Sequence, residues 1–355
     1  MTPPKRVLAI RLSALGDICM TLPVIDSVCR AYPDVQITLL TSRAGVAVAK
    51  TVLQLPNLSL LSFNKDDYKG IGGLNRLYRE LSALGFDAVA DLHDVLRTQW
   101  LDLRFRIAGK PVARIDKGRK EKSALTSHRQ FVQLTSGIER YRLVFVKLGL
   151  DCKVDYDGRA HAQLLLDQPC AVKASKWNAI GIAPFAQHRG KVYPEDLTRK
   201  VIAELVKQRP DIKIYLFGGP EEQAQLDTWV IAHPQNVVNR AGRQSLADDL
   251  RCMANLSLMI SMDSANMHLA SLVGLRCLSI WGATHRYAGF LGYGQSEDDC
   301  IEITSYPCRP CSIYGNKACQ YNDYHCLTDI MPSTIVNRIV KIVDSNTPAE
   351  DELSD

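Results

Sequence analysis

Residues that could do chemistry gather in five short segments of this 355-residue chain, each directly after an apolar run typical of a β-strand. These segments combine carboxylates, histidines, a lysine and glycine turns, and they lie at residues 13–17, 91–94, 187–195, 217–222 and 263–268. Carboxylates and histidines transfer protons, whereas lysines and the starts of helices hold anions. Each segment could instead have a purely structural role, as a turn or a helix cap.

The first two segments offer proton acceptors. Gly16 allows a tight turn after a strand, and Asp17 then stands at the start of a helix, either as a stabilising cap or as a general base. The G-x-G-x-x-G fingerprint of dinucleotide binding is absent. Asp91 and His93 end another strand. Together with Ser13 and Gly16 they are candidates for contact with a substrate, although turn formation is the alternative explanation.

The next two segments offer groups for a phosphate and a sugar. Lys191 lies in a basic loop before Tyr193-Pro194-Glu195, where a helix is expected to begin, and it could hold a phosphate oxygen or simply be solvated. Glu222 follows a strand and the turn Gly218-Gly219. A carboxylate there could bind a ribose diol or stabilise the first turn of a helix.

The fifth segment lies between two apolar runs. Asp263 to Met267 mark the change from a strand to a helix, so the N–H groups of Ser264, Ala265 and Asn266 should be available to an anion such as a diphosphate. His268 would lie one turn further along. A helix cap remains the alternative explanation.

The elements that must position these residues alternate between strands and amphipathic helices, which predicts an α/β fold with parallel sheets. Two successive halves with this pattern predict two doubly wound domains facing a central cleft, with ligands beyond the carboxyl ends of the strands. The expected domains are residues 1–170 and 171–342, followed by a disordered acidic tail at 343–355. Expected strands are 6–11, 35–40, 58–63, 88–92, 179–183, 212–217, near 237, 258–261 and 277–281; expected helices include 18–31, 74–84, 95–105, 131–148 and 220–231.

Composition and charge narrow the class of protein. The chain is 46% hydrophobic and 23% charged, as in folded globular proteins. Its net charge of +5 is uneven, because basic residues cluster between Arg104 and Lys122. That stretch is either a solvated face or a surface for anionic lipid or a phosphorylated acceptor. It lacks interleaved aromatic residues, so nucleic acid is not an expected partner.

The compartment follows from the N-terminus and the cysteines. Arg11 interrupts the apolar stretch that follows the basic start, and no small-residue cleavage site closes it, so a signal peptide is not expected. We predict a cytoplasmic protein whose eleven cysteines are reduced thiols or metal ligands.

Taken together, the segments resemble glycosyltransferase family 9, the bacterial ADP-heptose:lipopolysaccharide heptosyltransferases. The resemblance runs from Arg6 to about Gly294 and rests on R-x-S-x-x-G-D at 11–17, Lys191 before Tyr193-Pro194, the run at 219–222, D-S-x-x-x-H-L-A at 263–270 and W-G-A-T at 281–284. It implies the GT-B fold, with the acceptor on the N-terminal Rossmann-like domain and the nucleotide sugar on the C-terminal one. The sequence departs from the family at Ala265, where many members have glycine, and at Trp281–Thr284, where many have Phe-Gly-Pro-Thr. These departures bear on the donor sugar and base.

The resemblance also implies roles. Asp17 is similar to the family's catalytic base, Lys191 to the donor's ligand, Glu222 to the ribose contact, and residues 263–268 to the site for the sugar and diphosphate. The implied reaction is an inverting transfer of a sugar, heptose in the family, to a lipopolysaccharide core or related lipid-linked glycan, without a cofactor in the chemistry. Because that acceptor lies in a membrane, peripheral contact with the inner face of the cytoplasmic membrane is expected. The alternatives are a nucleotide-sugar epimerase of similar fold and a catalytically silent sugar-nucleotide binding module.

Two patterns raise the question of a metal. The D-x-D pattern of Asp155 and Asp157 lies in a polar turn away from the expected sites, and we interpret it as coincidence. Four cysteines with the spacing C-x2-C-x7-C-x6-C permit a structural zinc or an iron–sulfur site, with a cluster of reduced thiols as the alternative; they are Cys308, Cys311, Cys319 and Cys326.

Overall fold

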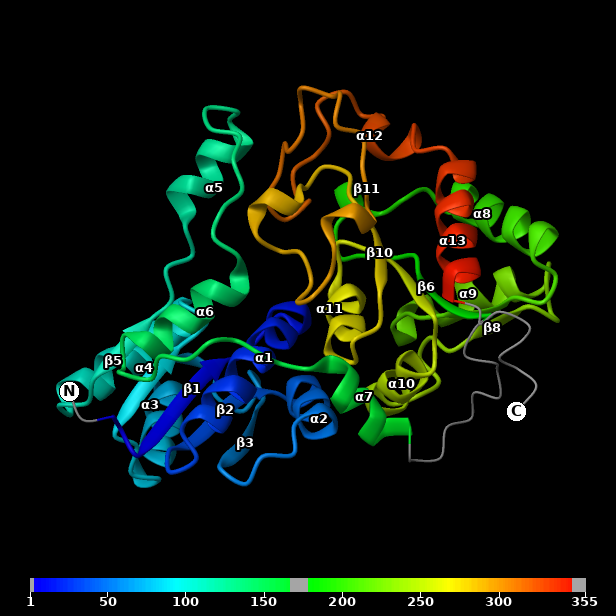
Figure 1. Ribbon diagram of the computed structural model, residues 1–355. Helices are drawn as coiled ribbons and strands as arrows, with labels where there is room; N and C mark the ends of the chain where they lie inside the picture. The colour runs from blue at the N-terminus through cyan, green and yellow to red at the C-terminus, as the bar shows by residue number, and fades with distance from the viewer. Residues whose placement is uncertain (1–2, 167–177, 347–355) are drawn as a thin grey trace. The chain divides into compact units, whose positions relative to one another are not determined.

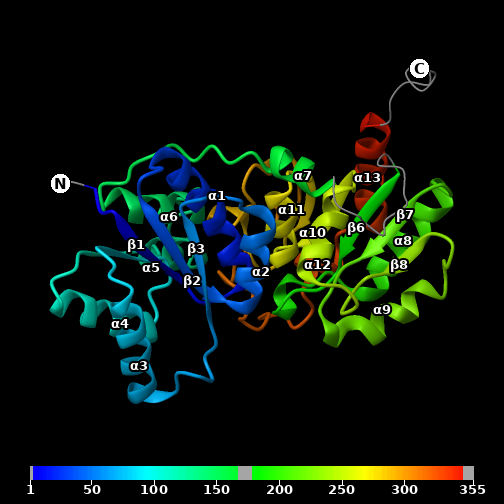
Figure 2. The same ribbon diagram turned by 90° about the horizontal axis from the view of Figure 1, so that it is seen from below.

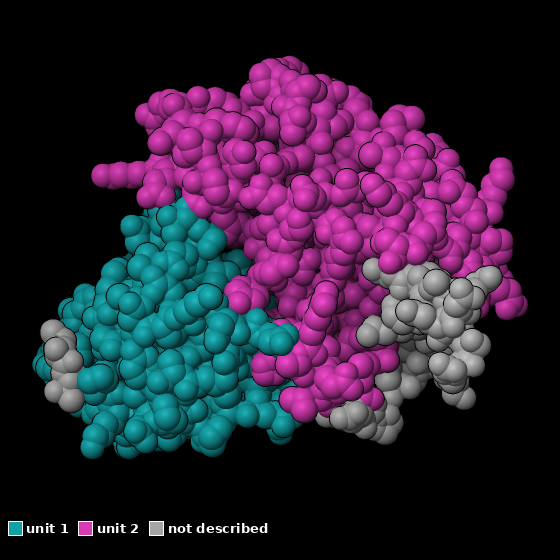
Figure 3. Space-filling model, viewed as in Figure 1, with its two compact units in different colours: residues 1–119, 135–157 teal, residues 120–134, 158–355 magenta. Residues whose placement is uncertain are grey.

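The computed structural model describes residues 3–166 and 178–346 (Figure 1). The chain divides into two compact units, coloured separately in Figure 3. The first comprises Met1–Arg119 and Thr135–Asp157, and the second comprises Lys120–Leu134 and Gly158–Asp355. A short segment from the N-terminal half therefore belongs to the second unit. The predicted boundary at 170/171 lies outside the described residues.

The first unit is built on a parallel sheet with the strand order β3-β2-β1-β4-β5. Its central strand, β1, is buried from Val7 to Arg11 and pairs in parallel with both β2 and β4. Apolar residues on both faces are what a strand covered on both sides requires. The strands are β1 (Arg6–Arg11), β2 (Gln36–Ser42), β3 (Leu58–Phe63), β4 (Ala88–Asp91) and β5 (Val112–Arg114).

Helices cover both faces of this sheet. On one face, Leu77 and Leu81 of α3 and Leu101 and Phe105 of α4 pack against sheet residues such as Ile10. α1, α2 and α6 pack on the sheet outside this cluster. The first unit therefore has the predicted doubly wound arrangement; its helices are α1 (Leu15–Ala31), α2 (Arg43–Val52), α3 (Gly70–Ala83), α4 (Leu96–Ile107) and α6 (Gly137–Val146), with α5 (Arg119–Thr126) leading into the second unit.

The second unit repeats the plan with the order β11-β10-β9-β6-β7-β8, again entirely parallel. α8, α9 and α13 share one large core with the sheet, while α11 packs on β9 and β10 beside α7 and α10. The strands are β6 (Ala179–Ala183), β7 (Lys213–Leu216), β8 (Val237–Asn239), β9 (Leu258–Met262), β10 (Cys277–Ile280) and β11 (Cys300–Ile301). The helices are α7 (Gly158–Leu166), α8 (Glu195–Gln208), α9 (Gln223–Val230), α10 (Leu246–Ala254), α11 (Ala265–Leu272), α12 (His325–Thr328) and α13 (Pro332–Asn346).

Each sheet has a topological switch point, where successive connections leave a central strand in opposite directions. It lies between β1 and β4 in the first unit and between β6 and β9 in the second. Ligands of such sheets bind beyond the carboxyl ends of the strands at this point. The loops after these four strands carry four of the five segments singled out from the sequence; the fifth follows β7.

Some predicted elements are wrong. The helix expected from Phe131 to Leu148 begins only at Gly137, where the Ser136 side chain accepts a hydrogen bond of 3.1 Å from the Glu139 N–H. Before it, the Leu134 N–H donates to the Tyr287 carbonyl of the second unit, at 2.9 Å. A tertiary contact therefore replaces the expected first turns. α13 continues to residue 346, so the predicted tail does not begin at 343; residues 347–355 lie outside the described ranges.

Candidate functional site

Asp17 lies in the first turn of α1, beyond the carboxyl end of β1. The N-cap of α1 is Ala14, which offers no side-chain cap. Arg11, the last residue of β1, forms an ion pair with Asp17 and donates to the Leu92 carbonyl at 2.8 Å. The Tyr141 hydroxyl donates to Asp17 Oδ1 at 3.4 Å. The carboxylate is thus oriented from both oxygens yet remains 29% exposed, which leaves it able to accept a proton from a ligand.

The neighbouring strand β4 places a neutral histidine at the same edge. His93 is buried, and its Nδ1 accepts the Leu12 N–H at 3.4 Å. Burial lowers the pKa of His93 to about 4, and the charges of Arg11 and Lys117 add to the shift. At neutral pH the ring is therefore uncharged, with its proton on Nε2 because Nδ1 acts as an acceptor.

Asp91 is fully buried and shapes this turn. Its Oδ1 accepts the N–H groups of His93 and Asp94 at 2.8 and 3.0 Å, and its Oδ2 accepts the Thr98 hydroxyl at 2.9 Å. Both oxygens are used inside the fold, which is the geometry of a residue that positions His93. Of the other two candidates here, Ser13 is exposed and Gly16 half-buried.

Basic residues surround this edge, and sequence reasoning did not select them individually. Lys117 donates to the Asp94 carbonyl at 3.0 Å, and Arg119 pairs with the Asp94 carboxylate at 2.9 Å. Burial lowers the pKa of Lys117, as does the charge of Arg11. Both residues follow β5, so predicting that short strand would have placed them at this edge. β5 was not among the predicted strands, and the two residues were therefore missed.

In the second unit, the structure joins two predicted residues directly. The Lys191 ammonium lies 2.8 Å from Asp263 Oδ2, and both side chains are largely buried. Lys191 follows β6 and Asp263 follows β9, so the pair spans the switch point. Gly315 makes room for it: a Cβ there would lie 2.6 Å from Lys191 Cγ, and the residue has a φ of +76°. The sequence alone did not reveal this glycine.

α11 begins immediately beside this pair. Its N-cap Ser264 does not cap the helix, because its hydroxyl instead lies 3.1 Å from that of Ser261. Ser264, Ala265 and Asn266 are half-exposed, whereas His268 is buried one turn further along. Uncapped N–H groups at an accessible helix start, next to a lysine, are able to hold an anion.

Glu222 lies at the same edge, after β7. Its Oε2 accepts the Gly219 N–H at 2.7 Å, which anchors one carboxylate oxygen in the turn. Partial burial raises the pKa of Glu222, and the Gly219 hydrogen bond acts in the opposite direction. An anchored carboxylate suits recognition of a hydroxyl pair.

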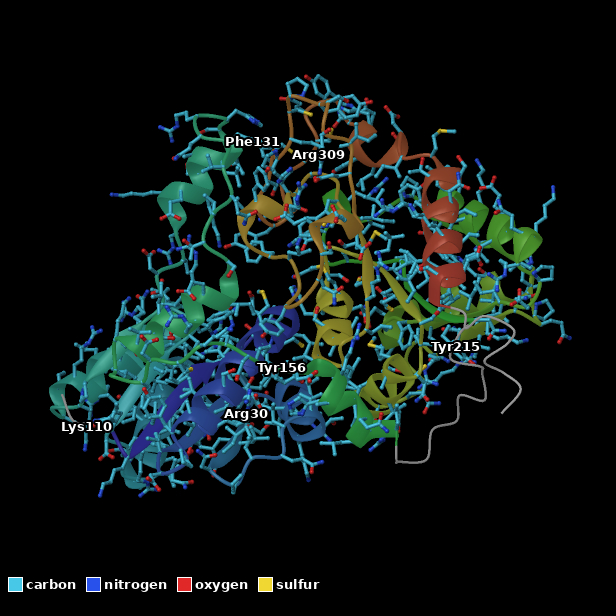
Figure 4. All side chains as sticks on the ribbon, viewed as in Figure 1. Arg30, Lys110, Phe131, Tyr156, Tyr215 and Arg309 are labelled. Carbon is cyan, nitrogen blue, oxygen red and sulfur yellow. The ribbon has the colours of Figure 1, made fainter. Side chains whose placement is uncertain are left out.

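A buried ionic network supports the loops after β10 and β11. Arg309, labelled in Figure 4, donates to the carbonyls of Trp281, Gly282 and Thr284 and to Glu302. Glu302 Oε2 also lies 3.3 Å from Nε2 of His285, and burial lowers the pKa of that histidine to about 4. Sequence reasoning missed this network, because its members are dispersed in loops without a recognisable spacing.

The four cysteines come from the irregular loop before and within α12. Cys308 Sγ lies 3.6 Å from His325 Nε2, and Cys319 Sγ lies 3.8 Å from Asp323 Oδ1. Burial raises the pKa of Cys326 to about 12, and the other three thiols add to the shift. Within residues 3–166 and 178–346, however, no three Cys, His, Asp or Glu side chains are grouped closely enough to hold a metal ion. Asp155 of the D-x-D pattern pairs with Arg30 at 2.6 Å.

The chain is similar to known proteins in both its sequence and its fold. The family model described as glycosyltransferase family 9 (heptosyltransferase) matches residues 74–321. Lipopolysaccharide heptosyltransferase 1 of Pseudomonas aeruginosa is 25% identical over 338 residues, covering 89% of this chain and 88% of that protein. A family 9 glycosyltransferase structure from Veillonella parvula matches with a TM-score of 0.71 at 20% identity, covering 96% and 98% of the two chains. The E. coli heptosyltransferase WaaC with ADP-2-deoxy-2-fluoro heptose matches with a TM-score of 0.67 at 18% identity, covering 96% and 100%.

Proposed function

The chain belongs to glycosyltransferase family 9, and from this premise we propose that it transfers heptose from ADP-heptose to the core of lipopolysaccharide or a related lipid-linked glycan. The observation that carries the proposal is the anion site of the second unit, where Lys191, Asp263 and the uncapped start of α11 meet at a switch point. The donor is supported by the structure of the similar WaaC with an ADP-heptose analogue, and the acceptor by the lipopolysaccharide heptosyltransferases among the relatives.

The second unit would bind the donor. The N–H groups that begin α11 would hold the diphosphate, with Lys191 neutralising charge as the nucleotide departs. Asp263 keeps the lysine in place and, with His268, would face the sugar. Glu222 would accept hydrogen bonds from the ribose hydroxyls.

The first unit would supply the base. Asp17 would remove the proton from an acceptor hydroxyl as its oxygen attacks the anomeric carbon. The bond from that carbon to the diphosphate oxygen breaks, ADP leaves with the electron pair, and the configuration inverts. Arg11 and Tyr141 orient the carboxylate, while Asp91 positions His93, whose neutral Nε2–H could donate to the acceptor.

The basic groups near Asp17 suit an acidic acceptor. Arg11, Lys117 and Arg119 lie at one edge of the first sheet, where carboxylate or phosphate groups of a core glycan would be attracted. None of the helices in the described ranges is long and apolar enough to cross a bilayer. Because this basic edge would attract an acidic acceptor anchored in a membrane, we propose that the enzyme meets its acceptor peripherally, at the cytoplasmic face of the membrane.

One assay tests this function against its alternatives. The protein is incubated with a panel of nucleotide sugars, with and without core-lipid acceptor, and release of nucleoside diphosphate is measured. We expect release from ADP-heptose that depends on the acceptor. Acceptor-independent turnover would favour an epimerase-like enzyme, and donor binding without turnover would favour a silent binding module; either result contradicts the proposal.

A structural zinc at the four cysteines stays a prediction, and the proposed chemistry does not use it. Metal analysis of reduced, tag-free protein tests it: one equivalent of zinc, lost on Cys308→Ser but kept on Cys300→Ser, which changes a cysteine outside the C-x2-C-x7-C-x6-C pattern, would support the site. Clearly substoichiometric zinc and iron in the wild-type protein would contradict the prediction of a metal site at these cysteines.

A further inference from the structure

Helix α4 of the first unit carries apolar side chains on the face that is turned away from the core. Leu96 is 86% exposed, Leu103 49% and Ile107 72%. Trp100, half-buried, falls between them in the sequence. At 100° per residue, these four positions lie within about 60° of one another, so they form one stripe along the helix. We call this set the α4 stripe.

The opposite face of α4 is the ordinary core face. Thr98, Leu101, Asp102 and Phe105 are buried and lie on the other side of the helix from the α4 stripe. Figure 2 shows α4 next to α3, the helix with which it packs. A helix on the surface of a soluble domain usually presents polar residues to water. The α4 stripe is therefore a largely exposed apolar face, opposite the face by which α4 packs on the core of its own unit.

Arginines flank the α4 stripe on both sides. On a helical projection, Arg97 and Arg104 lie on one side of it and Arg106 on the other. The guanidinium groups of Arg97 and Arg104 are held over the rings of Phe63 and Tyr78, at 5.4 and 4.8 Å. The one carboxylate in the α4 sequence, Asp102, is buried and paired with Arg114 at 2.7 Å. The exposed face of α4 is thus apolar along its centre and cationic along its edges.

We propose that the α4 stripe inserts into the interface of a bilayer with anionic headgroups, with its arginines on the lipid phosphates. This inference rests on the proposed function, in which the acceptor is anchored in a membrane. Charge complementarity favours an anionic membrane as the partner of the α4 stripe. Helices that lie in a membrane surface typically combine apolar side chains with basic neighbours. A second copy of the chain fits less well, because two-fold pairing of α4 would place arginines against arginines.

The test is binding to phosphatidylcholine vesicles, with and without phosphatidylglycerol, followed by sedimentation. Leu96→Glu/Ile107→Glu should weaken binding to anionic vesicles at least about tenfold, since it replaces inserted apolar groups with acids. Arg97→Gln/Arg106→Gln should weaken it about fivefold for each arginine removed, and less at high salt. The matched control is Ile231→Glu, which changes an equally exposed isoleucine at the end of α9 in the second unit and should bind as wild type does.

Three results would overturn the inference: no binding of the wild type to anionic vesicles, equal binding by the Leu96/Ile107 variant, or a wild-type dimer in solution that this variant disrupts. Because both positions are exposed, we expect the variants to unfold at the wild-type temperature. Transfer to a deacylated, water-soluble acceptor is measured in parallel and should be unaffected by Leu96→Glu/Ile107→Glu. If even the wild type fails in that assay, the proposed function fails, whatever the vesicles show.

Discussion

The two switch points share one topology and carry opposite chemistry. In the first unit, the strand that ends at Arg11 delivers a carboxylate, Asp17, fixed by an ion pair. In the second, the loops after β6 and β9 deliver an ammonium group, Lys191, fixed by the carboxylate of Asp263. Both sites lie at a helix start that has no side-chain cap. The shared topology fixes where a ligand can bind in each unit. In the proposed function, the charge of Asp17 makes the first place a proton acceptor, and the charge of Lys191 makes the second an anion site.

The largest expected effect comes from removing the proton acceptor. Asp17→Ala should lower kcat by a factor on the order of 10²–10⁴, the usual contribution of a general base, because the variant loses the carboxylate that is proposed to take the acceptor's proton. ADP affinity, measured by calorimetry, should change little, since the proposed donor site lies in the second unit. Equal loss of kcat and of ADP affinity would contradict the assignment of Asp17 as the base.

Removing the ammonium group should have a different signature. Lys191→Met should weaken ADP binding and also destabilise the second unit, by about 3–5 kcal/mol, because Asp263 would be left as an unpaired buried charge. Chemical denaturation gives the free energy of unfolding, and Lys191→Met/Asp263→Asn is the matched control. The double variant should regain much of the stability but not the affinity. Full recovery of ADP affinity in the double variant would show that Lys191 acts only structurally.

The positions of the strands and switch points were predictable from the sequence, whereas the ion pairs formed at the switch points were not. β1 and β6 lie where the apolar runs predicted them, because buried parallel strands consist of continuous apolar residues. The placement of Asp17 and Lys191 after strands followed from the same pattern. The ion pairs of Asp17 with Arg11 and of Lys191 with Asp263 depend on tertiary geometry, which no local spacing encodes. Residues 131–134 do not form the predicted helix for the same reason. The Leu134 N–H donates to the Tyr287 carbonyl, which is distant in the sequence.

Two buried histidines, one in each unit, make the stability of the folded protein depend on pH. Burial lowers the pKa of both His93 and His285 to about 4, and in each the Nδ1 accepts a backbone N–H. Because the unfolded pKa is near 6.5, the unfolded chain binds an extra proton between these values, so stability is full above about pH 6.5 and falls as the pH drops toward 4. His93→Asn and His285→Asn should each remove about 3 kcal/mol of that pH dependence. Denaturation at a series of pH values measures it; profiles parallel to wild type would show that the histidines are not neutral in the fold.

The smallest expected effect concerns the ribose. Glu222→Gln keeps an acceptor for the Gly219 N–H but removes the charge, so ADP affinity should fall by about tenfold with kcat unchanged. Glu221→Gln, an exposed neighbour, is the control and should have no effect. If both variants bind ADP as wild type does, the ribose lies elsewhere.

The anomeric configuration of the product tests the central claim most directly. A single base in one unit and a single anion site in the other suffice for one displacement at the anomeric carbon, without a covalent sugar intermediate. NMR of the glycan formed from ADP-heptose and a deacylated core acceptor should therefore show a linkage of inverted configuration. A product with retained configuration would contradict the division of chemistry between Asp17 and Lys191.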